Sequence, residues 1–322
     1  MSDVVTMNDL TNKEIMSILD DAERLVPVAK GDIHLPLLEG KVLANMFFEN
    51  STRTRMSFES AMKRLGGSVL NFTSVGTSVA KGETLFDTMQ MVDGYADVAV
   101  IRHPRQGAAQ YSADAIGIPI LNAVIQYAIG IPILNAGDGA GNHPTQTMLD
   151  LFTIRESHGT LEGLNVALVG DLRYGRTVHS LSHALVRFGA TLTLVSPEGL
   201  KMPVEIVSDL REHGAEVVET SDLAGVVPEA DVIYMTRIQK ERFPDEDEYA
   251  KVAGIYMLDS SDMSGAKDGM IVMHPLPRVS ELHPSLDNTE NARYFQQAFN
   301  GVPTRMALLC RCLGVKVPKK VK

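Results

Sequence analysis

Short apolar runs alternate with amphipathic segments along the chain, and this alternation restricts its fold more than any other feature. Residues 42–48 form a compact apolar run that predicts a buried strand, and 68–72 and 96–101 predict further strands. Residues 52–65 carry apolar side chains at helical spacing, and a second helix is predicted over 85–95. A strand–helix–strand series of this kind predicts a parallel sheet with helices on both faces.

A second series of the same kind follows residue 143. Its predicted helices span 145–156, 176–188 and a segment that ends at 213, and its predicted strands span 165–169, 192–195, 216–219 and 232–235. The length of 322 residues also suits about two domains. We therefore expect an α/β fold with two doubly wound parallel-sheet domains and an active site between them. Residues 1–143 with 300–322 would form one domain, residues 144–299 the other, and a last helix at 303–312 would return to the first.

One apolar segment occurs twice, because residues 115–123 (AIGIPILNA) recur identically at 128–136. Without a third copy, this is a local tandem duplication rather than a repeat architecture. Only one copy can fill one strand of a sheet. The second copy directly precedes Gly137, so we expect it to form the strand. The first copy, together with 124–127, would form an additional loop or a displaced strand.

The composition limits the classes of partner. A net charge of −10 and a pI of about 5.4 disfavour binding to nucleic acid or to an anionic membrane. The first ten residues include Asp3 and Asp9 and lack an apolar run, so we do not expect them to act as a signal peptide. No apolar stretch reaches the length expected of a membrane span. The two cysteines, Cys310 and Cys312, are too few for a four-ligand zinc site and are expected to be reduced in a cytoplasmic protein.

The segment STRTR at 51–55 follows a predicted strand and opens a predicted helix. The free N–H groups and the dipole of a helix start attract an anion. The hydroxyl groups of Ser51, Thr52 and Thr54 and the guanidinium of Arg53 add donors suited to phosphate oxygens. We interpret the segment as a phosphate site; the alternative is an ordinary Ser/Thr helix cap with solvated arginines.

Six further segments place Arg, Lys, His or Gln beside Gly, Pro, Ser or Thr, and they are residues 77–84, 100–105, 142–147, 169–177, 234–242 and 273–278. Several follow predicted strands, where open α/β sheets place ligand-binding groups. His143 and Gln146 can face one side of a helix and donate to a carbonyl oxygen. Each segment alone is also compatible with a solvated loop or a helix cap. Together, in a chain of net charge −10, they indicate a site for two anionic substrates.

The seven segments, in this order and over nearly the whole chain, resemble the aspartate/ornithine carbamoyltransferase family. STRTR at 51–55 resembles its carbamoyl phosphate motif, and HPTQ at 143–146 resembles its carbonyl-binding motif. RIQ at 237–239 and HPLP at 274–277 are similar to the aspartate branch, since the ornithine branch typically has a cysteine in place of Pro275. The resemblance implies transfer of the carbamoyl group of carbamoyl phosphate to the amino group of L-aspartate, an early step of de novo pyrimidine synthesis.

The resemblance also implies a role for each site residue. Carbamoyl phosphate would be bound by Ser51, Thr52, Arg53, Thr54, Arg102, His143, Gln146 and the carbonyls of Leu276 and Pro277. Among these, His143, Arg102, Thr54 and Arg53 would be catalytic. Aspartate would be bound by Lys81, Arg176, Arg237 and Gln239, with Ser78 and Lys81 supplied by the adjacent subunit of a homotrimer. No cofactor and no metal are implied, and a separate zinc-containing regulatory chain stays open as a partner.

Three alternatives are left. A sister carbamoyltransferase acting on another amine would need other side chains in place of Arg237 and Gln239. A catalytically silent subunit is kept open by the duplication just before His143. A dehydrogenase is the third, although 169–177 lacks the G-x-G-x-x-G spacing of dinucleotide sites.

Overall fold

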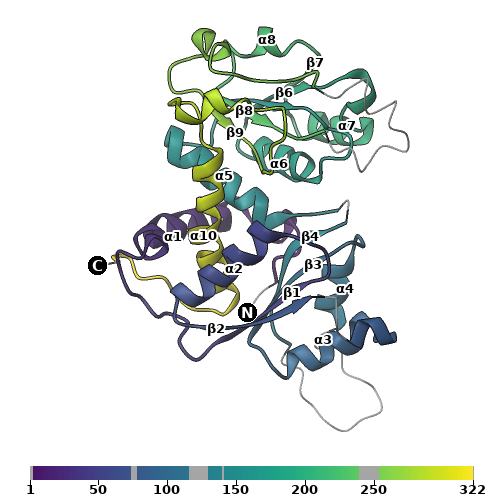
Figure 1. The fold of residues 1–322 in the computed structure, drawn as a ribbon, viewed down its shortest axis with the longest axis vertical. Helices are drawn as coiled ribbons and strands as arrows, with labels where there is room; N and C mark the ends of the chain where they lie inside the picture. The colour runs from purple at the N-terminus through teal and green to yellow at the C-terminus, as the bar shows by residue number, and fades with distance from the viewer. Residues whose placement is uncertain (1–2, 74–77, 116–129, 140, 239–253, 322) are drawn as a thin grey trace. The chain divides into compact units, whose positions relative to one another are not determined.

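The computed structural model describes residues 3–73, 78–115, 130–139, 141–238 and 254–321. The chain divides into two compact units, which we call unit 1 (Met1–Leu149 with Asn300–Lys322) and unit 2 (Asp150–Phe299). Each contains one parallel sheet with helices packed on it (Figure 1). The α/β class predicted from the alternating pattern is therefore confirmed.

Unit 1 has four parallel strands in the order β2-β1-β3-β4. The strands are β1 (Val42–Phe47), β2 (Ser68–Thr73), β3 (Val98–His103) and β4 (Ile133–Asp138). The helices are α1 (Asn12–Lys30), α2 (Thr52–Arg64), α3 (Leu85–Asp93) and α4 (Ala108–Ala115), with short 3-10 turns at Met7–Asp9 and Ser78–Lys81. Because β2 and β3 lie on opposite sides of β1, the direction in which strands are added reverses between β1 and β3.

Helices cover both faces of the central strands of unit 1. On one face, Met46 and Ile101 pack against Met89 of α3 and Ala109 of α4. On the other, the Asn45 side-chain amide donates to the Arg55 carbonyl of α2 at 3.3 Å. Strands enclosed in this way are apolar almost throughout, which explains why their sequences are continuous apolar runs rather than alternating ones.

The second copy of the duplicated segment supplies β4. Its last residues, from Ile133, pair with β3 in the register Val100↔Leu134. The prediction that the second copy forms the strand is confirmed. The first copy lies outside the described residues from position 116 onward, so its predicted loop or displaced strand stays a prediction. Its first residue ends α4, a helix that the sequence pattern did not predict.

Unit 2 has five parallel strands in the order β7-β6-β5-β8-β9. The strands are β5 (Asn165–Val169), β6 (Thr191–Val195), β7 (Val217–Thr220), β8 (Val232–Met235) and β9 (Ile271–Met273). The helices are α5 (Pro144–His158, which begins in unit 1), α6 (Arg176–Val186), α7 (Val204–Glu212) and α8 (Leu223–Val226), with 3-10 turns at Glu198–Leu200, Asp262–Gly265 and Pro284–Asn288. Here the order of strand addition reverses between β5 and β8.

A buried carboxylate of unit 2, that of Asp150, is hydrogen-bonded through both of its oxygens. The carboxylate of Asp150 accepts the Tyr234 hydroxyl at 3.0 Å and the Gln297 amide at 2.7 Å. Tyr234 lies on the central strand β8 and is fully buried. Pairing of this kind removes the cost of burying a carboxylate and fixes α5 against the sheet.

The last helix, α10 (Tyr294–Cys312), begins earlier than predicted. Pro303 suggested a helix start at 303 because proline suits the first turn, but it lies inside the helix. From Asn300 onward α10 belongs to unit 1, where the Arg305 guanidinium lies 5.0 Å from the Phe58 ring centre and Arg311 Nη2 lies 2.5 Å from Glu14 Oε1. The predicted return of the last helix to the first domain is thus confirmed, although its predicted start was wrong.

Within the described ranges, no helix combines the length and the apolar character needed to cross a membrane.

Candidate active site

The predicted phosphate segment and Arg102 meet at one edge of the unit 1 sheet. β1 leads through a turn into α2, and Arg102 lies near the end of the neighbouring strand β3. The Phe48 N–H donates to the Arg102 carbonyl at 2.8 Å, so the two strand ends are joined. This is the point where strand addition reverses, and open α/β sheets bind ligands outside the strand carboxyl ends at such points.

The start of α2 presents donors to solvent. Ser51 is the N-cap residue with extended backbone (φ −157°), and its side chain makes no capping hydrogen bond. Thr52 and Arg53 are exposed and Thr54 is buried. Partial desolvation lowers the pKa of Arg53, although an arginine remains charged at neutral pH. The reading of Ser51 as an ordinary side-chain cap therefore fails, and an anion at this helix start would meet a positive dipole.

Arg102 is held in place by two neighbours. Its Nη1 donates to the Ala136 carbonyl of β4 at 3.2 Å, and its Nη2 lies 3.2 Å from Glu49 Oε2. Only 9% of the residue is exposed. Glu49 was not among the residues singled out from the sequence, because a carboxylate beside a predicted phosphate site looks like a solvated neighbour.

His143 lies buried at the start of α5, directly before Pro144. Its Nδ1 lies 3.5 Å from Thr145 Oγ1, and its carbonyl accepts the Gln146 N–H at 3.0 Å. His143 and Gln146 therefore share the first turn, as their spacing predicted.

Asp138 fixes the loop that leads to His143. Its carboxylate accepts the Gly107 N–H at 2.8 Å and the Asn142 N–H at 2.7 Å. It is 3% exposed and thus joins the loop after β3 to the loop after β4 from inside the protein. The sequence offered no signal for this role, since the two partners are far apart along the chain.

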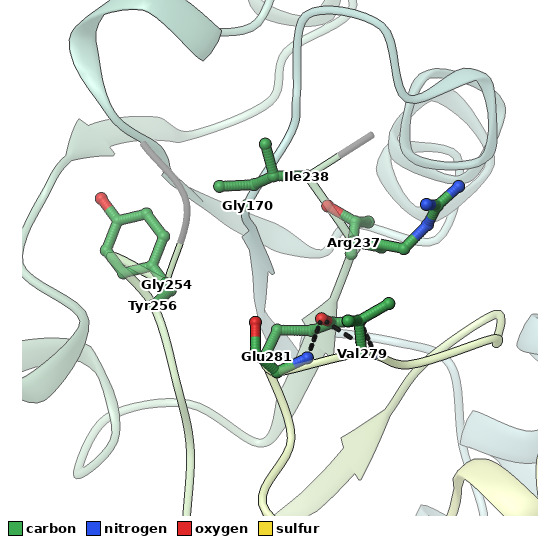
Figure 2. A pocket seen from close by; sticks show the side chains of 9 residues that line it. Gly170, Arg237, Ile238, Gly254, Tyr256, Val279 and Glu281 are labelled. Atoms are coloured by element: carbon green, nitrogen blue, oxygen red, sulfur yellow. Dashed lines mark hydrogen bonds between the residues drawn. The ribbon is translucent and has the colours of Figure 1, made fainter. Parts of the chain in front are cut away.

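A pocket in unit 2 lies at the corresponding reversal, at the carboxyl ends of β5 and β8 (Figure 2). The Thr236 N–H donates to the Val169 carbonyl at 2.8 Å, and its hydroxyl accepts the Asp171 N–H at 3.0 Å. Arg237 follows β8 directly and lines the pocket with Gly170, Tyr256 and Glu281 among others. Both units therefore place predicted ligand residues at the same topological position.

Gly170 is required by the close approach of these two strand ends. Its φ is +113°, and a Cβ built on it would lie 2.5 Å from the Thr236 carbonyl oxygen. We expect Gly170→Ala to lower the free energy of unfolding by about 2–5 kcal/mol, through backbone strain and overpacking together. Urea denaturation followed by circular dichroism measures the change.

Gly189→Ala is the matched control, because Gly189 also has a positive φ (+71°) but has open space around the position of a Cβ. It should cost only about 1–2 kcal/mol. Equal losses in the two variants would contradict the close approach at Gly170.

The two arginines of segment 169–177 differ in their solvent exposure and in their contacts. Arg176 is the first residue of α6 and is half-buried. Arg173 is exposed, lies 5.4 Å from the Tyr174 ring centre and donates to the Gly199 carbonyl at 3.4 Å. The loop between β5 and α6 is fixed by the Tyr174 N–H, which donates to Asp171 Oδ1 at 2.9 Å.

The remaining predicted residues differ in how far the structure describes them. Leu276 and Pro277 lie in the loop after β9, and the peptide bond between them is cis. Lys81 ends the 3-10 turn that begins at Ser78 and is exposed. Gln239 lies outside the described residues. Among the residues that are described, no group of three or more His, Cys, Asp or Glu is placed to hold a metal ion.

Two family models together match most of the chain. Residues 2–156 match the carbamoyl-P binding domain of aspartate/ornithine carbamoyltransferases, and residues 162–312 match the Asp/Orn binding domain. The chain belongs to the aspartate/ornithine carbamoyltransferase family. The resemblance drawn from the seven sequence segments is thereby confirmed.

The similar family members are aspartate carbamoyltransferases. The chain is 52% identical over 314 residues to the aspartate carbamoyltransferase catalytic subunit of Thermococcus onnurineus, with 97% of each chain covered. It resembles the solved catalytic subunit of M. jannaschii aspartate transcarbamoylase with a TM-score of 0.87 and 45% identity, over 98% of both chains. A third relative is the Trypanosoma cruzi aspartate transcarbamoylase solved with carbamoyl phosphate and aspartate, with a TM-score of 0.87, 39% identity and coverage of 96% and 95%.

Proposed function

We propose that this member of the family transfers the carbamoyl group of carbamoyl phosphate to the amino group of L-aspartate, giving N-carbamoyl-L-aspartate and phosphate. The observation that carries the proposal is the placement of a basic ligand site at the reversal point of each sheet, with the phosphate segment in unit 1 and Arg237 in unit 2. Solved relatives from Trypanosoma cruzi contain carbamoyl phosphate with aspartate, or carbamoyl aspartate with phosphate, which supports the same reaction here.

Unit 1 binds the phosphate end of carbamoyl phosphate. The first-turn N–H groups of α2, the hydroxyls of Ser51, Thr52 and Thr54, and the Arg53 guanidinium surround the phosphate oxygens. The exposed start of α2 supports this assignment, because the ligand can reach it without a change in the helix. The dipole and the fixed donors supply a positive field in a chain whose net charge is −10.

The carbonyl oxygen of carbamoyl phosphate accepts hydrogen bonds from Thr54, Arg102 and His143. Attack by the aspartate amine converts this oxygen into an oxyanion, so donors placed here act mainly on the transition state. All three residues are buried, and the guanidinium of Arg102 is held in position by Glu49 and by the Ala136 carbonyl. Groups fixed in this way need little reorganisation when the charge develops.

Unit 2 selects the acceptor. Arg176, Arg237 and Gln239 bind the two carboxylates of aspartate, for which planar guanidinium forks are suited. The amine of the other substrate, carbamoyl phosphate, is bound by Gln146 and by the carbonyls of Leu276 and Pro277. The half-buried position of Arg176 at the first residue of α6 supports its role, because a carboxylate there is also favoured by the helix dipole.

The attacking amine must be neutral, and the leaving phosphate accepts its proton. Holding the two substrates in reacting geometry contributes about 7–11 kcal/mol, which is a large part of the barrier reduction. In this scheme no side chain forms a covalent intermediate.

The active form is a homotrimer in which the adjacent subunit supplies Ser78 and Lys81. The support in unit 1 is an edge strand, β2, together with the helix α2 that contacts it, because each carries one exposed large apolar side chain. Leu70 is 47% exposed and Met56 of α2 is 59% exposed. A subunit contact at this edge of the sheet would cover both side chains and the unpaired side of β2. The relatives are described as catalytic subunits, and this name supports a separate regulatory chain, which would contain zinc.

The location of the protein is cytoplasmic. Cys310 and Cys312 are free and buried, which supports a reducing compartment.

A product assay tests the proposal. The purified chain is incubated with carbamoyl phosphate and either L-aspartate or L-ornithine, and the products are separated by chromatography. We expect N-carbamoyl-L-aspartate to form and citrulline not to form. Turnover of ornithine alone would contradict the aspartate assignment, and a folded chain that turns over neither would favour the silent-subunit alternative.

A further inference from the structure

A buried histidine holds the loop whose carbonyls are assigned to the carbamoyl amine. The Leu276 N–H donates to His274 Nδ1 at 2.8 Å, and His274 is 1% exposed. Because Nδ1 accepts this bond, the ring proton lies on Nε2. Nε2 is 2.8 Å from Glu281 Oε1, so the ring connects the loop to a buried carboxylate.

Leu276 is the residue of this loop that most needs support. Its φ is +55°, in the left-handed region that residues other than glycine rarely adopt. Such a conformation persists where the surroundings hold it, and it is common at ligand sites. The bond from His274 falls on the N–H of this same residue, and the dihedral angles at Leu276 set the direction of its carbonyl.

Glu281 in turn orients the histidine ring. Its carboxylate also accepts the Val279 N–H at 3.2 Å and the Ser280 N–H at 3.1 Å, and Figure 2 shows it turned toward Val279. Burial opposes ionisation, but hydrogen bonds from His274 and from the Val279 N–H hold the pKa of Glu281 below its usual range. A charged acceptor therefore faces Nε2, which keeps the proton there and leaves Nδ1 free to accept from Leu276.

A second clamp holds the other end of the loop. Arg278 Nη2 lies 2.7 Å from Asp287 Oδ2, and its guanidinium lies 5.4 Å from the ring centre of Tyr294 and 5.5 Å from that of Phe295. The backbone at 275–277 is thus fixed on both sides by side chains that need not touch a ligand.

We infer that His274, oriented by Glu281, is a positioning residue that sets the carbonyls of Leu276 and Pro277 for the carbamoyl amine. The inference rests on the proposed function. The inference has a specific consequence, because inorganic phosphate has no amine. Phosphate would therefore bind only through the phosphate-binding donors of unit 1. His274 should therefore affect the binding of carbamoyl phosphate and leave the binding of phosphate unchanged.

Two matched variants test the two hydrogen bonds of the His274 ring one at a time. The carbonyl of an asparagine can take the place of Nδ1, so His274→Asn retains an acceptor for the Leu276 N–H. The amide of a glutamine can take the place of Nε2, so His274→Gln retains a donor to Glu281 but loses that acceptor. Calorimetric titration of each full-length variant with carbamoyl phosphate and with inorganic phosphate gives both dissociation constants.

We expect His274→Gln to raise the Kd for carbamoyl phosphate about tenfold, and His274→Asn to raise it less than about threefold, since one oriented hydrogen bond is at stake. The Kd for inorganic phosphate should not change in either variant. An unchanged preference for carbamoyl phosphate in His274→Gln, or equal losses for both ligands, would overturn the inference. A wild-type chain that does not prefer carbamoyl phosphate would overturn the proposed function and the inference with it.

Glu281→Gln provides an independent test if His274→Gln does not fold. Glutamine keeps the shape and an acceptor for His274, but its amide N–H groups face the N–H groups of Val279 and Ser280. The same selective loss of carbamoyl phosphate binding is expected. Loss of phosphate binding to the same degree would contradict a positioning role.

Discussion

Replacing His143 by alanine is expected to lower kcat about 10²–10³-fold, the effect of removing one donor to a developing oxyanion. His143 is buried at the start of α5, where Asp138 holds the preceding loop through the Asn142 N–H. The donor is therefore fixed before the substrates bind, and its loss should appear mainly in turnover. Steady-state assays with each substrate varied in turn give kcat and both KM values.

Two variants control this result. His143→Gln retains an amide donor and should recover part of the lost rate. His158→Ala removes a half-buried histidine from the last turn of the same helix and should leave kcat near the wild-type value. A His143→Ala enzyme whose KM for carbamoyl phosphate rises strongly at constant kcat would show a role in ground-state binding instead.

Replacing Arg176 by alanine is expected to raise the KM for aspartate about ten- to a hundredfold, since hydrogen bonds to charged groups contribute about 1.5–3 kcal/mol. The Kd for carbamoyl phosphate should stay nearly constant, because the residues assigned to its phosphate and carbonyl lie in unit 1. Initial rates over a wide range of aspartate concentrations, with a titration of carbamoyl phosphate alone, separate the two effects.

Arg173→Ala is the matched control for Arg176→Ala. It removes the same charge from the same segment, residues 169–177, but Arg173 is exposed and contacts the Tyr174 ring and the Gly199 carbonyl. Its KM for aspartate should change less than about threefold, as for an exposed charge. Equal increases in the two variants would mean that only the net charge of the loop matters.

The central strands and the start of α2 could be predicted because local signals agree there. Enclosed strands such as β1 are apolar except for Asn45, and a polar Ser–Thr pair follows β1 where α2 begins. Local signals failed at α10, since the preference of Pro303 for a first turn was overridden by a helix that already extended from Tyr294. They also failed at β9, which has three residues and is recognisable only by its pairing with β8.

The sequence indicated the cationic residues of the proposed site as candidates, but it did not indicate the acidic residues that position their neighbours. Asp138 accepts the Gly107 N–H, and Glu281 accepts from His274. A carboxylate that will be buried looks the same in a sequence as a solvated one, and only the fold supplies its partners.

The reversal points of the two sheets bear on how acceptor preference could diversify. At each point the buried strands provide stability, whereas the proposed ligand residues lie at or beyond the carboxyl ends of the strands. Changes after Met235 can therefore alter the acceptor that is recognised while the strands stay intact, whereas changes after Met273 would also reach the carbonyls of Leu276 and Pro277 that are assigned to carbamoyl phosphate. Directed evolution toward a new acceptor is best begun at Arg237, because β8 and the buried Thr236 that contacts Gly170 end before it.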